Sequence, residues 1–224
     1  RERQQSQQAA QRVNRDPYRD RTTAGFRLLD QNDLVNAEIE FKSVLGARPN
    51  DADAQGGPGL VRLKQKNFEE AQVLLAQASK RGNAGRWKEA LDSATYWSLV
   101  RGADKARADN RLSEAQRLLT QAVRIDRQEP TGQNNLADVL YIQGDYPAAE
   151  TLYRNVLKQT PDQPDALRGL ITVLPQVGKS EEAMQLVARL TPEQQEGMGN
   201  LGALRAEEAM RQARLASVWT RPSP

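Results

Sequence analysis

A 34-residue repeat constrains what this chain can fold into more than any other feature of its sequence. Alanine recurs at this interval inside similar short stretches, among them "NDLVNAEIEFKSVL", "KNFEEAQVLLAQAS" and "GDYPAAETLYRNVLKQTP". One interval is longer by 10 residues, which indicates an insertion between the second and third copies. A repeat of this length predicts stacked units rather than one compact core. The alanines that mark the copies are Ala37, Ala71, Ala115, Ala149 and Ala183.

Each copy has the pattern of two short helices. Apolar residues follow the marker alanine at steps of three and four, as in Ala149, Leu152, Tyr153 and Val156. A second amphipathic stretch lies upstream of every marker, for example "NNLADVLYIQ" before Ala149. The period and the helix pair together are the signature of tetratricopeptide repeats. We therefore predict an all-α chain that forms a right-handed superhelical solenoid of tetratricopeptide repeats.

The register of the repeat divides the chain into five segments. We predict the end of a preceding repeat helix at 1–14, two repeats at 15–85, an insertion with a hinge and an extended helix at 86–95, three repeats at 96–197, and the start of a further repeat helix with a frayed tail at 198–224. Both ends interrupt the pattern, so we expect the chain to be a piece of a longer protein.

Residue size within the pattern predicts how the paired helices pack. Small residues recur on both helices of a pair and allow the two helices to approach closely. Asp33 and Asp145 precede second helices and are expected to cap them, with Pro147 in the first turn. The larger residues four positions after each marker are expected to fill the space against the next pair, and they are Phe41, Leu75, Leu119, Tyr153 and Val187.

Two stretches depart from the pattern. Pro58 follows two glycines at a position where leucine is usual, and both residue types disfavour a helix interior. We predict that this helix starts late or is kinked, with a hinge between repeats as the alternative. In the insertion, Gly82 and Gly85 are predicted to form a structural hinge that precedes a long helix over about 86–108.

The composition excludes several classes of function. The 224 residues contain no cysteine and no histidine, so thiol nucleophiles, disulfides and the commonest general base and metal ligand are missing. Residues 1–21 hold six arginines against three acidic residues and so carry the whole net charge of +3. The repeats therefore lack the basic face of a nucleic-acid binder. No run of 18 apolar residues occurs, and we expect no membrane contact from this segment, no enzymatic activity, no cofactor and no metal site.

Three stretches resemble one bacterial family. They are "RDPYRDRTTAGFRLLDQ", the tryptophan-containing insertion that ends in "TYWSLVRGADKARADNRLSEAQRLL", and "LADVLYIQGDYPAAETLYRNVLKQTPDQPDALRGL". Together they are similar to the repeat region of cellulose synthase operon protein C, a family of bacterial outer-membrane cellulose exporters. The resemblance implies a periplasmic scaffold, part of an outer-membrane protein, between an inner-membrane synthase and an outer-membrane pore. It implies other subunits of that complex as partners, and β-glucan as a further candidate.

The concave face of such a solenoid is lined by recurring positions of the first helix in each repeat. Aromatic rings there can stack on sugars, and amide, carboxylate and guanidinium groups can bond hydroxyls. In the first two repeats these positions include Arg19, Thr22, Phe26 and Asp53. The residues that we single out as binding candidates are Trp97, Asn134, Asp138, Tyr141 and Arg168.

Alternatives to a glucan-contacting scaffold stay open at this point. The groove could meet only water, with Trp87 and Trp97 serving in packing. The chain could also be a generic repeat adaptor that binds a peptide in its concave groove. A polysaccharide hydrolase would need two carboxylates in a paired geometry, which scattered acidic residues on helix surfaces do not predict.

Overall fold

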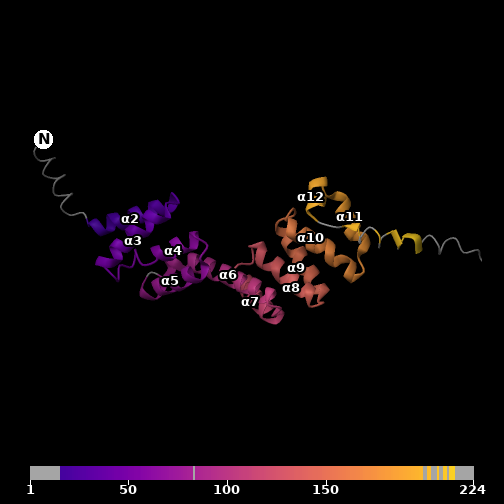
Figure 1. The fold of residues 1–224 in the computed structure, drawn as a ribbon, viewed down its shortest axis with the longest axis horizontal. Coiled ribbons are helices and arrows are strands. Elements are labelled where there is room, and N and C mark those ends of the chain that lie inside the picture. Colours follow the sequence, from indigo (N-terminus) through magenta and orange to yellow (C-terminus); the bar gives the residue numbers. More distant parts are fainter. Residues whose placement is uncertain are drawn as a thin grey trace, which may run out of the picture. The chain divides into compact units, whose positions relative to one another are not determined.

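The computed structural model describes residues 16–82 and 84–198, together with 201, 202, 206, 209, 210 and 212–214. The predicted helix end at 1–14 and much of the predicted segment 198–224 lie outside these residues. The described residues form helices joined by turns and contain no strand, which confirms the all-α class. Figure 1 shows the succession of helices along the chain.

The chain forms two compact units, Arg1–Ser98 and Leu99–Pro224. The described helices of the first unit are α2 (Pro17–Asp30), α3 (Leu34–Ala47), α4 (Gly57–Lys64), α5 (Phe68–Arg81) and the first part of α6 (Ala84–Ala108). Those of the second are the rest of α6, α7 (Leu112–Ile125), α8 (Pro130–Ile142), α9 (Tyr146–Gln159), α10 (Pro164–Val173), the 3-10 helix η1 (Leu174–Val177), α11 (Ser180–Arg189) and α12 (Pro192–Gly197).

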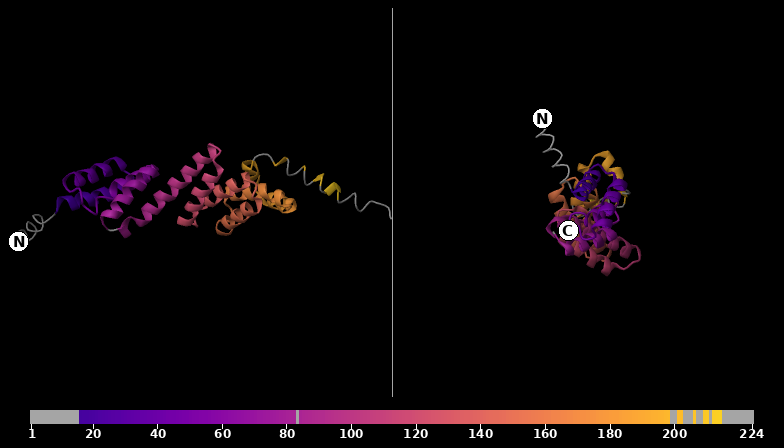
Figure 2. Two further views of the ribbon diagram at one scale, coloured as in Figure 1. Left: turned by 90° about the horizontal axis from the view of Figure 1, so that it is seen from below. Right: turned by 90° about the vertical axis from the view of Figure 1, so that its left-hand side faces the viewer.

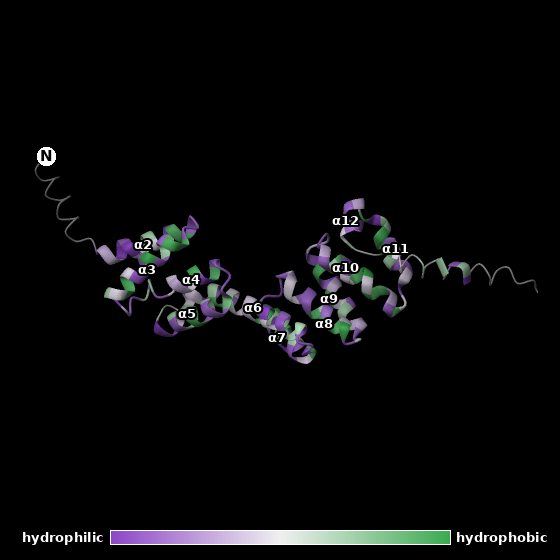
Figure 3. Ribbon diagram, in the orientation of Figure 1, coloured by the Kyte–Doolittle hydropathy of each residue, from purple (hydrophilic) through white to green (hydrophobic). Residues whose placement is uncertain are grey.

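Consecutive helices pack as the pairs that the repeat predicts. In the first unit α2 packs on α3 and α4 on α5, and in the second unit α8 packs on α9 and α10 on α11. Within each unit, neighbouring pairs also contact each other, as α3 does with α4 and α9 with α10 (Figure 2). Figure 3 shows both apolar and polar residues along the helices, as expected where one face is buried. The neighbouring pair therefore supplies the apolar surface that each pair needs.

Burial confirms the register of the repeat. All five marker alanines have no exposed surface, at 0%. The larger residues four positions later are at most 3% exposed, so they do fill the space between pairs. Caps confirm the helix starts as well: the Asp33 side chain accepts from the backbone N–H of Asn36, and Asp145 accepts from that of Ala148, both at 3.3 Å.

The departure at Pro58 is a late helix start, as predicted. Helix α4 begins at Gly57, so Pro58 lies in the first turn, where its missing N–H breaks no helical hydrogen bond. The adjacent glycines allow two aromatic rings to lie against the backbone. A Cβ at Gly56 would come closer than 3.0 Å to the Trp87 ring, and one at Gly57 equally close to the Phe41 ring. The glycines thus make room for the aromatic core of the first unit.

The insertion contributes a single long helix. Helix α6 spans Ala84–Ala108, close to the predicted 86–108. Trp87, in its first turn, is 2% exposed and packs in a cluster with Ala71 and Leu75 of α5, so packing is its role. Gly82 follows the last residue of α5, and Gly85 lies inside the first turn of α6. A hinge at these glycines stays a prediction.

The last repeat has two features that the periodicity did not predict. Helix α10 ends at Val173 and continues as the 3-10 turn of η1, where Pro175 lacks the N–H that an α-helix would use. The short helix α12 starts at Pro192. Its start is stabilised by a capping box between Thr191, the residue before the helix, and Gln194 in the first turn. The sequence predicted the next helix only from residue 198.

Candidate functional site

The structure distributes the predicted binding residues over helices α6, α8 and α10: Trp97, Asn134, Asp138, Tyr141 and Arg168. Trp97 belongs to the first unit and the other four to the second. The Trp97 ring is half-buried and stacks on Phe68, with ring centroids 5.9 Å apart. One face of Trp97 is therefore used in packing, and a ligand role for this residue stays a prediction.

Asp138 is held by a buried tyrosine. The hydroxyl of Tyr153, on α9, donates to Asp138 Oδ1 at 2.5 Å, and Arg107 Nη1 lies 3.6 Å from Asp138 Oδ2. Burial raises the pKa of Tyr153, and the carboxylate that its hydroxyl faces raises it further. Asp138 thus joins the helices of its own repeat, and its orientation is fixed before any ligand arrives.

Asn134 lies one turn before Asp138 on the same side of α8. Its side chain is 4% exposed, and neither Oδ1 nor Nδ2 has a hydrogen-bond partner among the described residues. The other two candidates contact their own neighbours: Tyr141 lies 5.3 Å from Tyr146, centroid to centroid, and Arg168 donates to Asp165 at 2.5 Å. A shared ligand for these residues stays a prediction.

The first unit contains a polar pocket that sequence reasoning only partly anticipated. Its volume is about 410 Å³. Helix α2 contributes Arg19, the turn before α4 contributes Asp51 and Asp53, and the start of α6 contributes Arg86. The half-buried ring of Phe26 forms an apolar part of the wall. This pocket brings together charged groups of both signs beside an aromatic ring.

Local turns and caps place the acidic groups of this pocket, which from here on we call the α2–α6 pocket. Asp16 caps α2 by accepting from the backbone N–H of Tyr18 at 3.1 Å, and it also accepts from Arg48 at 2.5 Å. Asp51 accepts from the N–H groups of Asp53 and Ala54 at 3.1 and 2.9 Å. These carboxylates are therefore fixed in the absence of a ligand.

The basic groups of the α2–α6 pocket are placed in different ways. Arg86 donates to Asp53, and its guanidinium lies 4.7 Å from the centre of the Phe26 ring. Arg48 lies beside the pocket, and its hydrogen bond holds the pKa of Asp16 below its usual range, so this carboxylate stays charged at neutral pH. The third basic group, Arg19, is exposed, and its N–H donors are open to solvent.

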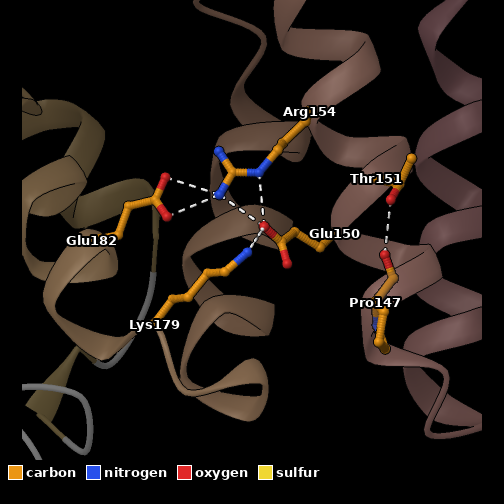
Figure 4. A network of polar contacts seen from close by, with 6 residues as sticks. All are labelled: Pro147, Glu150, Thr151, Arg154, Lys179 and Glu182. Carbon is orange, nitrogen blue, oxygen red and sulfur yellow. Dashed lines mark hydrogen bonds and ion pairs between the residues drawn. The ribbon is translucent and has the colours of Figure 1, made fainter.

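A second polar arrangement joins neighbouring repeats in the second unit (Figure 4). Glu150 of α9 accepts from Arg154 at 2.8 Å and from Lys179, the residue before α11, at 2.7 Å. Arg154 also donates to both oxygens of Glu182 on α11, at 2.8 and 2.9 Å. Glu150 is 8% exposed, so its charge is compensated inside the interface between two repeats.

The first unit has a similar arrangement. Glu38 of α3 accepts from Arg62 of α4 at 2.8 Å and pairs with Lys42 at 2.7 Å, while Arg62 also reaches Glu70 at 3.0 Å. The hydrogen bond from Arg62, followed by that from Lys42, lowers the pKa of Glu38 to about 2. Glu38 and Glu150 each follow a marker alanine directly, so the same repeat position carries an inter-repeat ion pair in both units.

Replacing Glu150 with glutamine is expected to lower the free energy of unfolding by about 1 kcal/mol at pH 7. This loss is small for a broken buried ion pair, because solvent screens the partly exposed side chains of Lys179 and Arg154. Burial alone would raise the pKa of Glu150, but the hydrogen bonds from Lys179 and Arg154 outweigh it and hold that pKa below its ordinary value of 4.5. The stabilisation by the Glu150 ion pairs is therefore complete at a pH above the ordinary pKa of 4.5. It is lost as the pH falls through the lower pKa that Glu150 has in the folded state.

Urea unfolding of the two proteins between pH 7 and pH 3 measures this difference. We expect the gap between them to narrow on the acid side. The exposed Glu89, changed to glutamine, serves as the control and should show no such gap at either pH. A Glu150→Gln gap that widened on acidification would contradict the assignment.

The described residues offer neither a metal cluster nor a membrane helix. Among them, no group of three or more acidic side chains is arranged to hold a metal ion. None of the described helices is both long and apolar enough to cross a bilayer.

Family profiles and sequence relatives agree with this architecture. Two profiles described as tetratricopeptide repeat match residues 100–164 and 140–208. The chain is 42% identical over 190 residues to cellulose synthase operon protein C of Xanthomonas axonopodis pv. citri, which covers 85% of this chain and 12% of that protein. It is 35% identical over 197 residues to the protein of that name from Pseudomonas fluorescens, and the match covers 87% of this chain and 15% of that protein. The chain thus spans less than a sixth of the length of these relatives.

Solved structures share the fold. The structure of Pseudomonas aeruginosa pilF matches with a TM-score of 0.52 and 16% identity, over 86% of this chain and 97% of that one. A tetratricopeptide repeat protein from Parabacteroides merdae matches with a TM-score of 0.51 and 16% identity, over 92% of this chain and 80% of that one. At this identity the similarity establishes the repeat fold alone.

Proposed function

Because this chain belongs to the tetratricopeptide-repeat proteins and is homologous to part of cellulose synthase operon protein C, we propose that it is a scaffold segment of a bacterial cellulose synthesis and export complex. In this role it lies in the periplasm and mediates contacts between the inner-membrane synthase and the outer-membrane pore. Its concave face also guides the nascent β-glucan chain. The segment itself performs no catalysis.

The observation that carries the proposal is the 42% identity over 190 residues to a protein of that name. The aligned part covers most of both described units, so the relationship is not limited to one repeat. The architecture fits a scaffold, because stacked helix pairs expose long helix faces while each pair is stabilised by its neighbours. The ion pairs at Glu38 and Glu150 support this role by joining consecutive repeats.

Affinity purification from a cellulose-producing bacterium tests the proposal. The tagged chain is exported to the periplasm, cross-linked briefly and purified, and we expect subunits of the cellulose synthesis machinery among the recovered proteins. The matched control carries Ala149→Arg, which places a bulky charged group at a fully buried position and separates α8 from α9.

Two outcomes would count against the scaffold. The first is recovery of the same proteins with the control, which would show that they do not depend on the repeat fold. The second is recovery of ligands that share one short linear motif, without any subunit of the cellulose machinery. That result would favour a generic peptide adaptor.

A further inference from the structure

We propose that the α2–α6 pocket of the first unit binds a short stretch of neutral β-linked glucan. The inference rests on the proposed function for the identity of the sugar, whereas the class of ligand, a neutral polyhydroxylated chain, follows from the pocket itself. The residues that carry it come from α2, from the turn before α4 and from the first turn of α6. The repeat pattern places Arg19, Thr22, Phe26 and Asp53 on the concave face, but none of the pocket residues is among the five binding candidates singled out from the sequence.

The size of the pocket suits a small polar ligand. Its volume of about 410 Å³ falls within the range of about 300–1,000 Å³ that is usual for small-molecule sites. Access is open, because Arg19, Thr23 and Asp53 are all exposed. Thr22 lies behind them, buried, with its hydroxyl bonded to the carbonyl of Tyr18 at 3.0 Å. The floor is thus rigid and the rim is available to a ligand.

The charges of the pocket cancel. Three carboxylates, Asp16, Asp51 and Asp53, are matched by the guanidinium groups of Arg19, Arg86 and Arg48, the last of which reaches Asp16 from beside the pocket. Without a net charge, the pocket has no electrostatic preference for an anionic or a cationic ligand. A phosphate, an acidic polysaccharide or a basic peptide would meet a group of its own sign as well as one of the opposite sign.

Donors and acceptors nevertheless remain for a ligand. A guanidinium has five N–H groups and a carboxylate accepts several hydrogen bonds, so Arg86 and Asp53 keep free capacity after pairing with each other. The exposed hydroxyl of Thr23 donates its proton to the backbone carbonyl of Arg19 at 2.9 Å, and its oxygen can still accept a hydrogen bond from a ligand. A sugar hydroxyl also donates and accepts, so a ligand that presents several hydroxyls matches this mixture better than a ligand with one kind of group.

The aromatic wall supplies the apolar contact that a pyranose ring needs. Phe26 is fixed edge-on to Phe41, with centroids 5.0 Å apart, and is stacked on Trp87 at 6.4 Å. The guanidinium of Arg86, 4.7 Å from the centre of the Phe26 ring, is held at the same wall. These neighbours cover much of the Phe26 ring, which is half-buried, and the part that stays exposed in the pocket offers an apolar contact to the axial C–H groups of a β-linked glucose unit while its equatorial hydroxyls meet the charged rim.

Titration of cellotetraose into the full chain tests the site, with binding followed by calorimetry and by ¹⁵N chemical shifts. We expect shifts in Arg19, Thr23 and Asp53. The double variant Arg19→Ala/Asp53→Ala, which removes two exposed rim groups, is expected to weaken binding by about tenfold. The matched control is Lys88→Ala/Asp92→Ala, an exposed ion pair of α6 that does not line the pocket, and its affinity should equal that of the parent chain.

Three results would overturn the proposal. One is the absence of cellotetraose binding, and another is equal affinity of the double variant and the parent chain. The third is equal or tighter binding of an anionic oligosaccharide such as tetragalacturonate, which would contradict the argument from charge balance. The purification experiment separates this failure from that of the scaffold: if the double variant still recovers cellulose-complex subunits, the scaffold stands even where the pocket does not.

Discussion

Replacing Trp87 with alanine is expected to lower the free energy of unfolding of the first unit by about 3–5 kcal/mol. The indole is 2% exposed and lies in a cluster with Ala71, Leu75 and Ala94. Its N–H has no hydrogen-bond partner among the described residues, so the loss comes from packing rather than from a broken hydrogen bond. Chemical denaturation followed by far-UV circular dichroism measures the effect.

Trp97→Ala is the matched control for this prediction. Trp97 lies in the same helix and has the same side chain, but it is half-buried and stacks on Phe68 at one face. Truncation there leaves a site open to water rather than a closed cavity, so we expect a clearly smaller loss. Equal losses for the two variants would show that the insertion is not anchored through Trp87.

The repeat register could be read from the sequence because it depends on residue size at regular spacing. Where two helices cross so closely that only the smallest side chains fit, a small residue such as alanine is required at each marker position. The five marker alanines are indeed all fully buried. The helix starts at Asp33 and Asp145 were equally readable, since a cap acts on the backbone two or three residues away. These features are local or strictly periodic.

The α2–α6 pocket could not be read in the same way. Arg19, Phe26 and Asp53 occupy regular concave positions, and Asp51 lies in a turn at the position that Glu129 and Gln163 hold in later copies, but Arg86 lies in the insertion and has no counterpart at the repeat period. Their meeting depends on the late start of α4 and on Trp87 docking against Gly56. A sequence signal was nonetheless present: the two glycines before Pro58 marked a place where the backbone makes room for another group.

For Asp138, the sequence predicted the position on α8 but not the hydrogen-bond partner, because the contact with Tyr153 spans two helices. Tyr153 was expected only to fill space, as Phe41 and Leu75 do at the equivalent positions. The hydroxyl gives this repeat a polar contact in addition to its apolar one, and periodicity contains no information on such differences between copies.

Gly169→Ala and Gly46→Ala are expected to change stability in opposite directions. A Cβ at Gly169 would lie closer than 3.0 Å to ring carbons of Tyr153, whereas nothing lies within 4 Å of a Cβ at Gly46. Both glycines are in helices, where alanine is intrinsically better by about 1 kcal/mol. Gly46→Ala should realise up to that gain, while overpacking at Gly169 should cost about 1–3 kcal/mol net.

The Tyr153 ring cannot move aside cheaply, because it is 2% exposed and its hydroxyl is bonded to Asp138. The double variant Gly169→Ala/Tyr153→Leu separates this clash from other effects of the methyl group. If the clash is the cause, the double variant loses less stability than the sum of the two single variants, since leucine leaves the space that the new Cβ occupies. Additive losses in thermal unfolding would instead mean that α10 approaches α9 less closely than the structure shows.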